Sequence, residues 1–102
     1  MIEIKVPTTL QIGGFNYSIE MSEEINKELW DNENWGEHSG RLRRIRLGTD
    51  CLPQQFSETF FHEVLHAIDT VYQGCQLSHQ EISALSNGLL QIFEQLGVRI
   101  VK

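Results

Sequence analysis

The chain contains few of the residues that mark specialised protein classes. Its 102 residues include 2 cysteines and 2 prolines, and no apolar run is long enough to span a bilayer. Cys51 and Cys75 form no C-x-x-C pattern, so two free thiols are expected rather than a disulfide scaffold. The sequence also has no internal repeat. It therefore predicts one globular domain over residues 1–102, which is too short for a second core.

Basic residues are scarce as well, since 8 Lys and Arg face 14 Asp and Glu and the net charge is −6. This balance argues against a nucleic-acid partner, because phosphate binding requires a basic surface. The segment from Met1 to Val6 alternates apolar and charged residues and has no signal-peptide apolar region. We therefore expect a cytoplasmic protein without a membrane partner.

Much of the negative charge lies in residues 20–37, which hold a single lysine. A solvated face is the preferred interpretation of such a charge run, and a substrate-selecting rim is the alternative. Trp30 and Trp35 fall in this segment and are expected in the core or in a pocket wall. The arginines between residues 41 and 46 are expected to balance these charges or to protect an exposed sheet edge. Such an edge, at residues 41–48, could also align an extended peptide by strand addition.

The N-terminal half has the pattern of short strands. Residues 2–6 alternate and end at Pro7, and residues 10–12 and 15–19 flank Gly13-Gly14, which predicts a strand followed by a tight hairpin. Ser22 predicts the N-cap of a short helix that ends near residue 30. Residues 32–40 are expected to form a loop, and the alternation in residues 41–48 predicts a further strand.

Two longer segments have helical periodicity. The first runs from about Pro53 to Tyr72, where Pro53 suits the first turn and Gly74 suits the end. The second runs from about residue 78 to Leu96 and ends at Gly97. Its apolar stripe, which is expected to be buried, contains Ile82, Leu85, Leu89, Ile92, Phe93 and Leu96. The sequence thus predicts an α+β domain with a small antiparallel or mixed sheet packed on the main helix and a C-terminal helix across it.

The main helix contains the motif H-E-x-x-H, from His62 to His66. With 4 histidines and 11 glutamates in the chain, random placement gives roughly a 2% chance of this pattern. Residues i and i+4 share one helix face, so both imidazoles can bind one ion. Glu63 lies about 100° round the helix, where it can take a proton from a water on the metal without being a ligand. Because both histidines centre the polar face, they are not core histidines.

A catalytic zinc site takes three protein ligands, so a third residue is needed. Glu81 is the preferred candidate because the helical wheel places it beside the apolar stripe, whereas His79 lies further round. Two alternatives remain. Ser78-x-x-Glu81 is also a capping box, in which Glu81 would only bond back to the helix start. In the other, His79 is the third ligand.

Supporting roles are predicted for other polar residues near the motif. Asp69, one turn after His66, is either a hydrogen-bond acceptor for a ligand imidazole or a surface acid. Peptide hydrolysis also requires a group that stabilises the developing oxyanion. The candidates are Tyr17, His38, Tyr72 and His79.

The segments H-E-V-L-H-A-I-D, at residues 62–69, and S-N-G-L-L-Q, at residues 86–91, resemble small phage- or prophage-type metallopeptidases. These proteins belong to the zincin superfamily, near the ImmA/IrrE-like and SprT-like domains. The resemblance implies a minimal zincin with zinc as cofactor, His62, His66 and Glu81 as ligands and Glu63 as general base. The H-x-x-G-x-x-H extension of metzincins is absent, since Asp69 stands where their glycine would be.

The expected function is zinc-dependent hydrolysis of peptide bonds in a protein or peptide substrate. The alternative is a zincin-like binding or phage-assembly module without catalysis, in which zinc is structural. A structural site would be closed by four protein ligands, whereas a catalytic site keeps one position open.

Overall fold

The computed structural model describes residues 1–102 and has an α+β architecture, as predicted. Its elements are β1 (Ile2–Lys5), β2 (Thr9–Ile12), β3 (Phe15–Glu20), α1 (Glu23–Asp31), β4 (Gly36–Ser39), β5 (Arg44–Leu47), α2 (Pro53–Gln73), α3 (His79–Gln95) and β6 (Val98–Val101). The predicted hairpin, the strand at residues 44–47 and the three helices are confirmed. Strands β4 and β6 were not predicted.

The main sheet has four strands in the order β2-β3-β5-β4. β3 and β5 are parallel, and the two outer pairs are antiparallel. β1 and β6 form a separate parallel pair, which joins the two ends of the chain. Since β5 lies between β3 and β4, the prediction of an exposed edge at residues 41–48 is wrong. The exposed edge near α2 is β4.

One arginine of this region, Arg46, balances acidic charges, which was one of the two predicted roles. Arg46 Nη2 lies 2.6 Å from Glu28 Oε2, and Arg46 Nη1 lies 3.5 Å from Glu37 Oε1. These ion pairs connect β5 with α1 and with β4. The arginine alternation therefore marks one face of an internal strand rather than a free edge.

The core forms where the sheet meets α2. Alternation along β3 and β5 directs buried apolar side chains to the face covered by α2. The core cluster comprises Val6, Ile12, Tyr17, Ile19, Ile45, Leu47, Phe56 and Ala67. α2 thus has one apolar face on the sheet, and its other faces are available for α3 and for a polar site.

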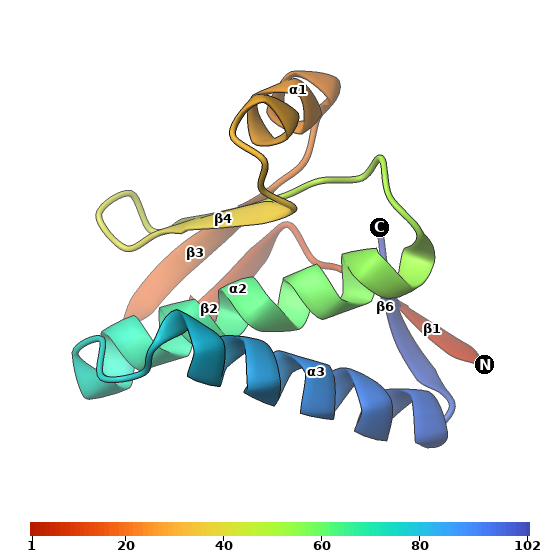
Figure 1. Cartoon of the computed structure of the whole chain (residues 1–102). Coiled ribbons are helices and arrows are strands. Elements are labelled where there is room, and N and C mark those ends of the chain that lie inside the picture. Colours follow the sequence, from red (N-terminus) through yellow and green to blue (C-terminus); the bar gives the residue numbers. More distant parts are fainter.

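The layers follow the order sheet, α2 and α3, and the two long helices lie side by side (Figure 1). α1 lies away from α3, next to the β4 and β5 side of the sheet, and buries Ile25 and Leu29. No helix combines the length and the apolar character that a membrane crossing requires.

The packed face of α3 differs from the predicted stripe. Ile82 and Ser86 are fully buried, whereas Leu85 and Ile92, expected in the stripe, are about half exposed. The packed face also contains a polar contact, in which Ser86 Oγ donates a 2.8 Å hydrogen bond to Glu58 Oε1 of α2. A helical wheel that counts only apolar residues cannot detect a buried polar side chain on the packed face.

Candidate metal centre

The two histidines of the motif face each other on α2. His62 Nε2 and His66 Nε2 are 3.1 Å apart, and both side chains are partly buried. Two nitrogens bound at 2.0–2.1 Å to one tetrahedral zinc would be roughly 3.3 Å apart. The helix is continuous from Pro53 to the left-handed C-cap at Gly74, so the pair lies on a rigid scaffold. The spacing therefore suits a shared metal ion with little movement.

His79 is the third member of the cluster. One ring nitrogen from each of His62, His66 and His79 lies within 4.8 Å of the other two. The ring centroids of His79 and His62 are 4.7 Å apart, and those of His79 and His66 are 5.5 Å apart. Three imidazoles from two helices thus converge on one point.

Glu81 does not join this cluster, which differs from the preferred prediction. Its carboxylate accepts a 2.8 Å hydrogen bond from the Ser78 amide, and the Ser78 hydroxyl accepts a bond from the Glu81 amide. The expected capping box is therefore formed. The physical reason is the orientation of α3: His79 and Ser86 lie within about 60° of the buried Ile82, whereas Glu81 lies about 100° away on the opposite side. The structure thus brings His79, not Glu81, to the histidine pair.

Asp69 holds the connection that delivers His79. The residue is 3% exposed, and its carboxylate accepts hydrogen bonds from the amides of Gln76 at 3.0 Å and Leu77 at 3.2 Å. It makes no hydrogen bond to a histidine and is not a surface acid, so neither predicted role is observed. Its buried carboxylate instead fixes the short turn between α2 and α3.

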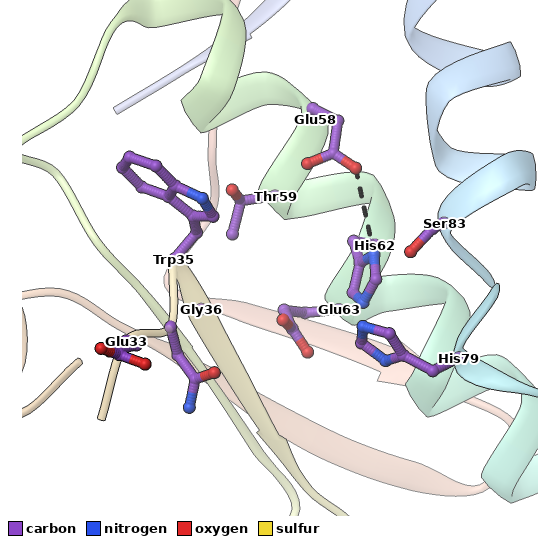
Figure 2. Close-up of a pocket in the computed structure, with 10 residues that line it drawn as sticks. Glu33, Trp35, Gly36, Glu58, Thr59, His62, Glu63, His79 and Ser83 are labelled. Carbon is purple, nitrogen blue, oxygen red and sulfur yellow. Dashed lines mark ion pairs between the residues drawn. The ribbon is translucent and has the colours of Figure 1, made fainter. Parts of the chain in front are cut away.

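Glu58 was not predicted as a site residue. Its Oε1 lies 3.9 Å from His62 Nδ1, the nitrogen that faces away from His66, and also receives the Ser86 hydrogen bond (Figure 2). Gln55 Nε2 donates to the other carboxylate oxygen at 3.2 Å. A carboxylate in this position orients a ligand imidazole and raises its basicity. The sequence feature that could have identified Glu58 is its spacing of four residues from His62, which places the two side chains on the same face of the helix.

Glu63 is buried between α2 and β4, with 7% of its surface exposed. Burial raises the pKa of this carboxyl to about 8, and the charges of Glu58 and Glu37 add to the shift. In Figure 2 the Glu63 side chain lies between Gly36 and the ring of His79. A Cβ at Gly36 would lie 2.5 Å from Thr59 Cγ2 and 3.1 Å from Glu63 Cγ. Only glycine therefore allows β4 to lie this close over the carboxylate.

The surroundings keep the imidazoles of His62 and His66 neutral. Burial, followed by the charges of His62, His79 and His38, lowers the pKa of His66 to about 4. Burial also lowers the pKa of His62, an effect that the Glu58 charge opposes. Only the neutral imidazole binds metal, so protons compete weakly at this site near neutral pH. Three imidazoles form a donor set that fits zinc.

The oxyanion candidates are separated by the fold. Tyr72 is 66% exposed, and its ring lies near Gly13 in the hairpin turn. His38, on β4, stacks parallel to His66 with ring centroids 6.3 Å apart. The hydroxyl of the fully buried Tyr17 lies 3.2 Å from His38 Nε2. Besides the ligand candidate His79, His38 is therefore the candidate nearest to the histidine pair.

A cleft of about 270 Å³ opens beside the histidines. Its walls come from the loop before β4, from α2 and from the start of α3, and Figure 2 shows its side chains converging on the space between these elements. The lining residues are Glu33, Asn34, Trp35, Gly36, Glu58, Thr59, His62, Glu63, His79 and Ser83. Two of the three imidazoles, those of His62 and His79, and the carboxyl of Glu63 thus line one cleft, and His66 lies next to His62.

The two extreme pKa values predict how pH affects the stability of metal-free protein. His66 titrates near 4 when folded and near its ordinary value of 6.5 when unfolded, so stability falls as pH drops from 6.5 towards 4. Glu63 keeps its proton to about 8 when folded but loses it near its ordinary value of 4.5 when unfolded, so its contribution falls as pH rises through this range. Above pH 6.5 only the Glu63 effect of this pair remains, and we expect a loss of about 2 kcal/mol up to pH 8.

Urea unfolding of chelator-treated protein between pH 4 and 9 measures this profile. Between pH 4.5 and 6.5 the two effects oppose each other, so Glu63→Gln should remove the alkaline loss and make the acid loss steeper than in the wild type, since glutamine does not titrate. An alkaline slope that persists unchanged in Glu63→Gln would contradict the assignment.

Comparisons with protein-family models, with curated proteins and with solved structures gave no match for this chain. The assignment of function therefore depends on the geometry of the cluster and its cleft.

Proposed function

We propose that the protein is a zinc-dependent metallopeptidase with a reduced zincin-like fold. The observation that carries the proposal is the convergence of three imidazoles, from His62, His66 and His79, beside a cleft that also contains the buried carboxyl of Glu63. No fourth Cys, Asp or Glu belongs to the group. Three protein ligands and one open position are typical of catalytic zinc, whereas structural zinc has four protein ligands.

The roles of the residues follow from their positions. The three imidazoles would hold the metal, and Glu58 would orient the His62 ring through Nδ1. Bound zinc would polarise the substrate carbonyl and lower the pKa of the attacking water. Glu63 would accept the proton of that water and transfer it to the leaving amine. A nearby cation also lowers the pKa of a carboxyl, so the elevated pKa of Glu63 would fall to a value suited to a base.

His38 is the proposed group for the developing oxyanion. Arg43 Nη1 donates to the Tyr17 hydroxyl at 3.5 Å, which leaves the hydroxyl proton for His38 Nε2. His38 then carries its own proton on Nδ1. Burial and the Arg43 charge lower the pKa of His38, so the ring is a neutral donor at pH 7.

The substrate is proposed to be an extended segment of a protein chain. β4 is the edge of the sheet, and Gly36 at its start lines the cleft. An extended peptide that adds to this edge would run past Glu63 and the histidines. This replaces the predicted alignment on residues 41–48, which is excluded because β5 is internal.

Metal removal tests the proposal. Protein purified without chelator should contain one zinc per chain and should cleave casein; dialysis against EDTA should abolish cleavage, and added zinc should restore it. The alternative, a non-catalytic module with structural zinc, predicts retained zinc without cleavage. For this alternative, EDTA should lower the melting temperature, and no proteolysis should be detected either before or after the treatment.

A further inference from the structure

A second hollow adjoins the cleft on the side away from His79. It has a volume of about 320 Å³ and is lined by Trp30, Glu33, Asn34 and Trp35. The last three of these residues also line the metal cleft, so the two spaces lie next to each other. Trp30 and Trp35 are 72% and 54% exposed. Two large indoles are thus left open to solvent next to the proposed reaction site, where a protein of this size would normally bury them.

The charges around the hollow have one sign. Glu33 lines both spaces, its carboxylate has no hydrogen bond or ion pair, and the carboxylate of Glu58 lines the cleft beyond it. No lysine or arginine lines either space. An indole face attracts a cation, and an unpaired carboxylate beside it adds to that attraction. A negatively charged side chain would be repelled at the same place.

We propose that this hollow binds a lysine or arginine side chain of the substrate, close to the bond that is cleaved. The proposal rests on the proposed peptidase function, since it assigns a specificity subsite to the same cleft. Trp30 and Trp35 contact the aliphatic stem and the cationic head, and Glu33 pairs with the charge. The acidic segment at residues 20–37 thereby contributes a substrate-selecting rim at its C-terminal end.

The backbone conformation of Glu33 makes this residue suitable for a substitution that tests the subsite. Its φ is 57°, in the left-handed region that glycine adopts without strain and other residues adopt at some cost. The position closes the end of α1, where the Glu33 amide bonds the Trp30 carbonyl at 3.0 Å. Glu33→Gly removes the carboxylate and relieves this strain, so any loss of binding cannot be attributed to a destabilised fold.

Intrinsic fluorescence reports directly on the hollow because the chain has only 2 tryptophans and both line it. The probes are capped five-residue peptides of alanine with one central lysine, arginine, norleucine, phenylalanine or glutamate. We expect lysine and arginine peptides to change the emission of zinc-loaded Glu63→Gln protein with an affinity about tenfold above norleucine. Added salt should reduce this difference because it screens the charge. Equal or tighter binding of norleucine or phenylalanine would overturn the proposal.

Hydrolysis by the wild-type protein provides the second readout. A casein-derived peptide mixture should be cleaved next to lysine or arginine, and Glu33→Gly and Trp30→Leu should each lose most of that preference. Glu24→Gln is the control, since it removes one exposed charge on α1 outside the hollow. Metal-dependent cleavage without preference for basic residues refutes the subsite and leaves the peptidase function intact. Fluorescence binding of basic peptides without any cleavage refutes the function and supports the subsite.

Discussion

Replacing Glu63 with glutamine is expected to reduce zinc-dependent peptide hydrolysis by about 10³-fold while zinc remains bound. General bases contribute roughly 10²–10⁴ to such reactions, and glutamine cannot accept the proton. The shape of the side chain is preserved, so the contact with Gly36 and the position of β4 are unaffected. Single-turnover cleavage of a fluorogenic peptide, together with metal analysis of the same sample, measures both quantities.

The matched control for this variant is Glu37→Gln. Glu37 is another β4-side carboxylate whose charge raises the pKa of Glu63, but it does not line the cleft. Its removal should change the rate by less than about threefold, because it alters the electrostatic surroundings of Glu63 and one ion pair with Arg46 but no group that lines the cleft. If Glu63→Gln cleaves peptides at a rate close to that of Glu37→Gln, then Glu63 is not the base.

Removing His79 is expected to weaken zinc binding by more than about 100-fold. Loss of a residue that merely orients a ligand costs 10–100-fold in metal affinity, and loss of a ligand should exceed this range. Glu81→Ala is expected to leave zinc affinity unchanged and to destabilise the protein, since it removes half of a capping box. Competition with a zinc-binding dye and urea unfolding separate the two effects.

His38→Ala is the control for loss of one histidine near the site. It keeps all three proposed ligands, so its zinc affinity should match that of the wild-type protein, while its hydrolysis rate should fall. The opposite pattern for the α3 variants, with zinc lost in Glu81→Ala and retained in His79→Ala, would restore the ligand set that the sequence favoured.

Local signals in the sequence were sufficient for most elements of the fold. Gly13-Gly14 between two alternating runs predicts the hairpin, and Ser22 and Gly74 mark helix ends that the structure confirms. β4 and β6 could not be predicted because each has four residues, with no buried residue to produce an alternating pattern. β6 is a strand because it pairs with β1 at the other end of the chain, and β4 is a strand because it pairs with β5 across a short turn.

The site was predictable only where it lies on one helix. The spacing of His62 and His66 fixes their shared face, and the structure places their nitrogens 3.1 Å apart. The third imidazole depends on how α3 is rotated against α2, and the packed face of α3 includes the buried Ser86, which donates a hydrogen bond to Glu58. No periodicity of apolar residues encodes a buried serine, so the wheel favoured Glu81 over His79.

The Ser86–Glu58 bond has a consequence for the folding of the C-terminal third of the chain. α3 packs on α2 and has only two fully buried residues, Ile82 and Ser86. It nevertheless supplies His79 and, through Glu58, orients His62. A metal that binds all three imidazoles would cross-link the two helices, and its binding free energy would stabilise the docking of α3. Metal occupancy and closure of the helical hairpin would then be a single cooperative event.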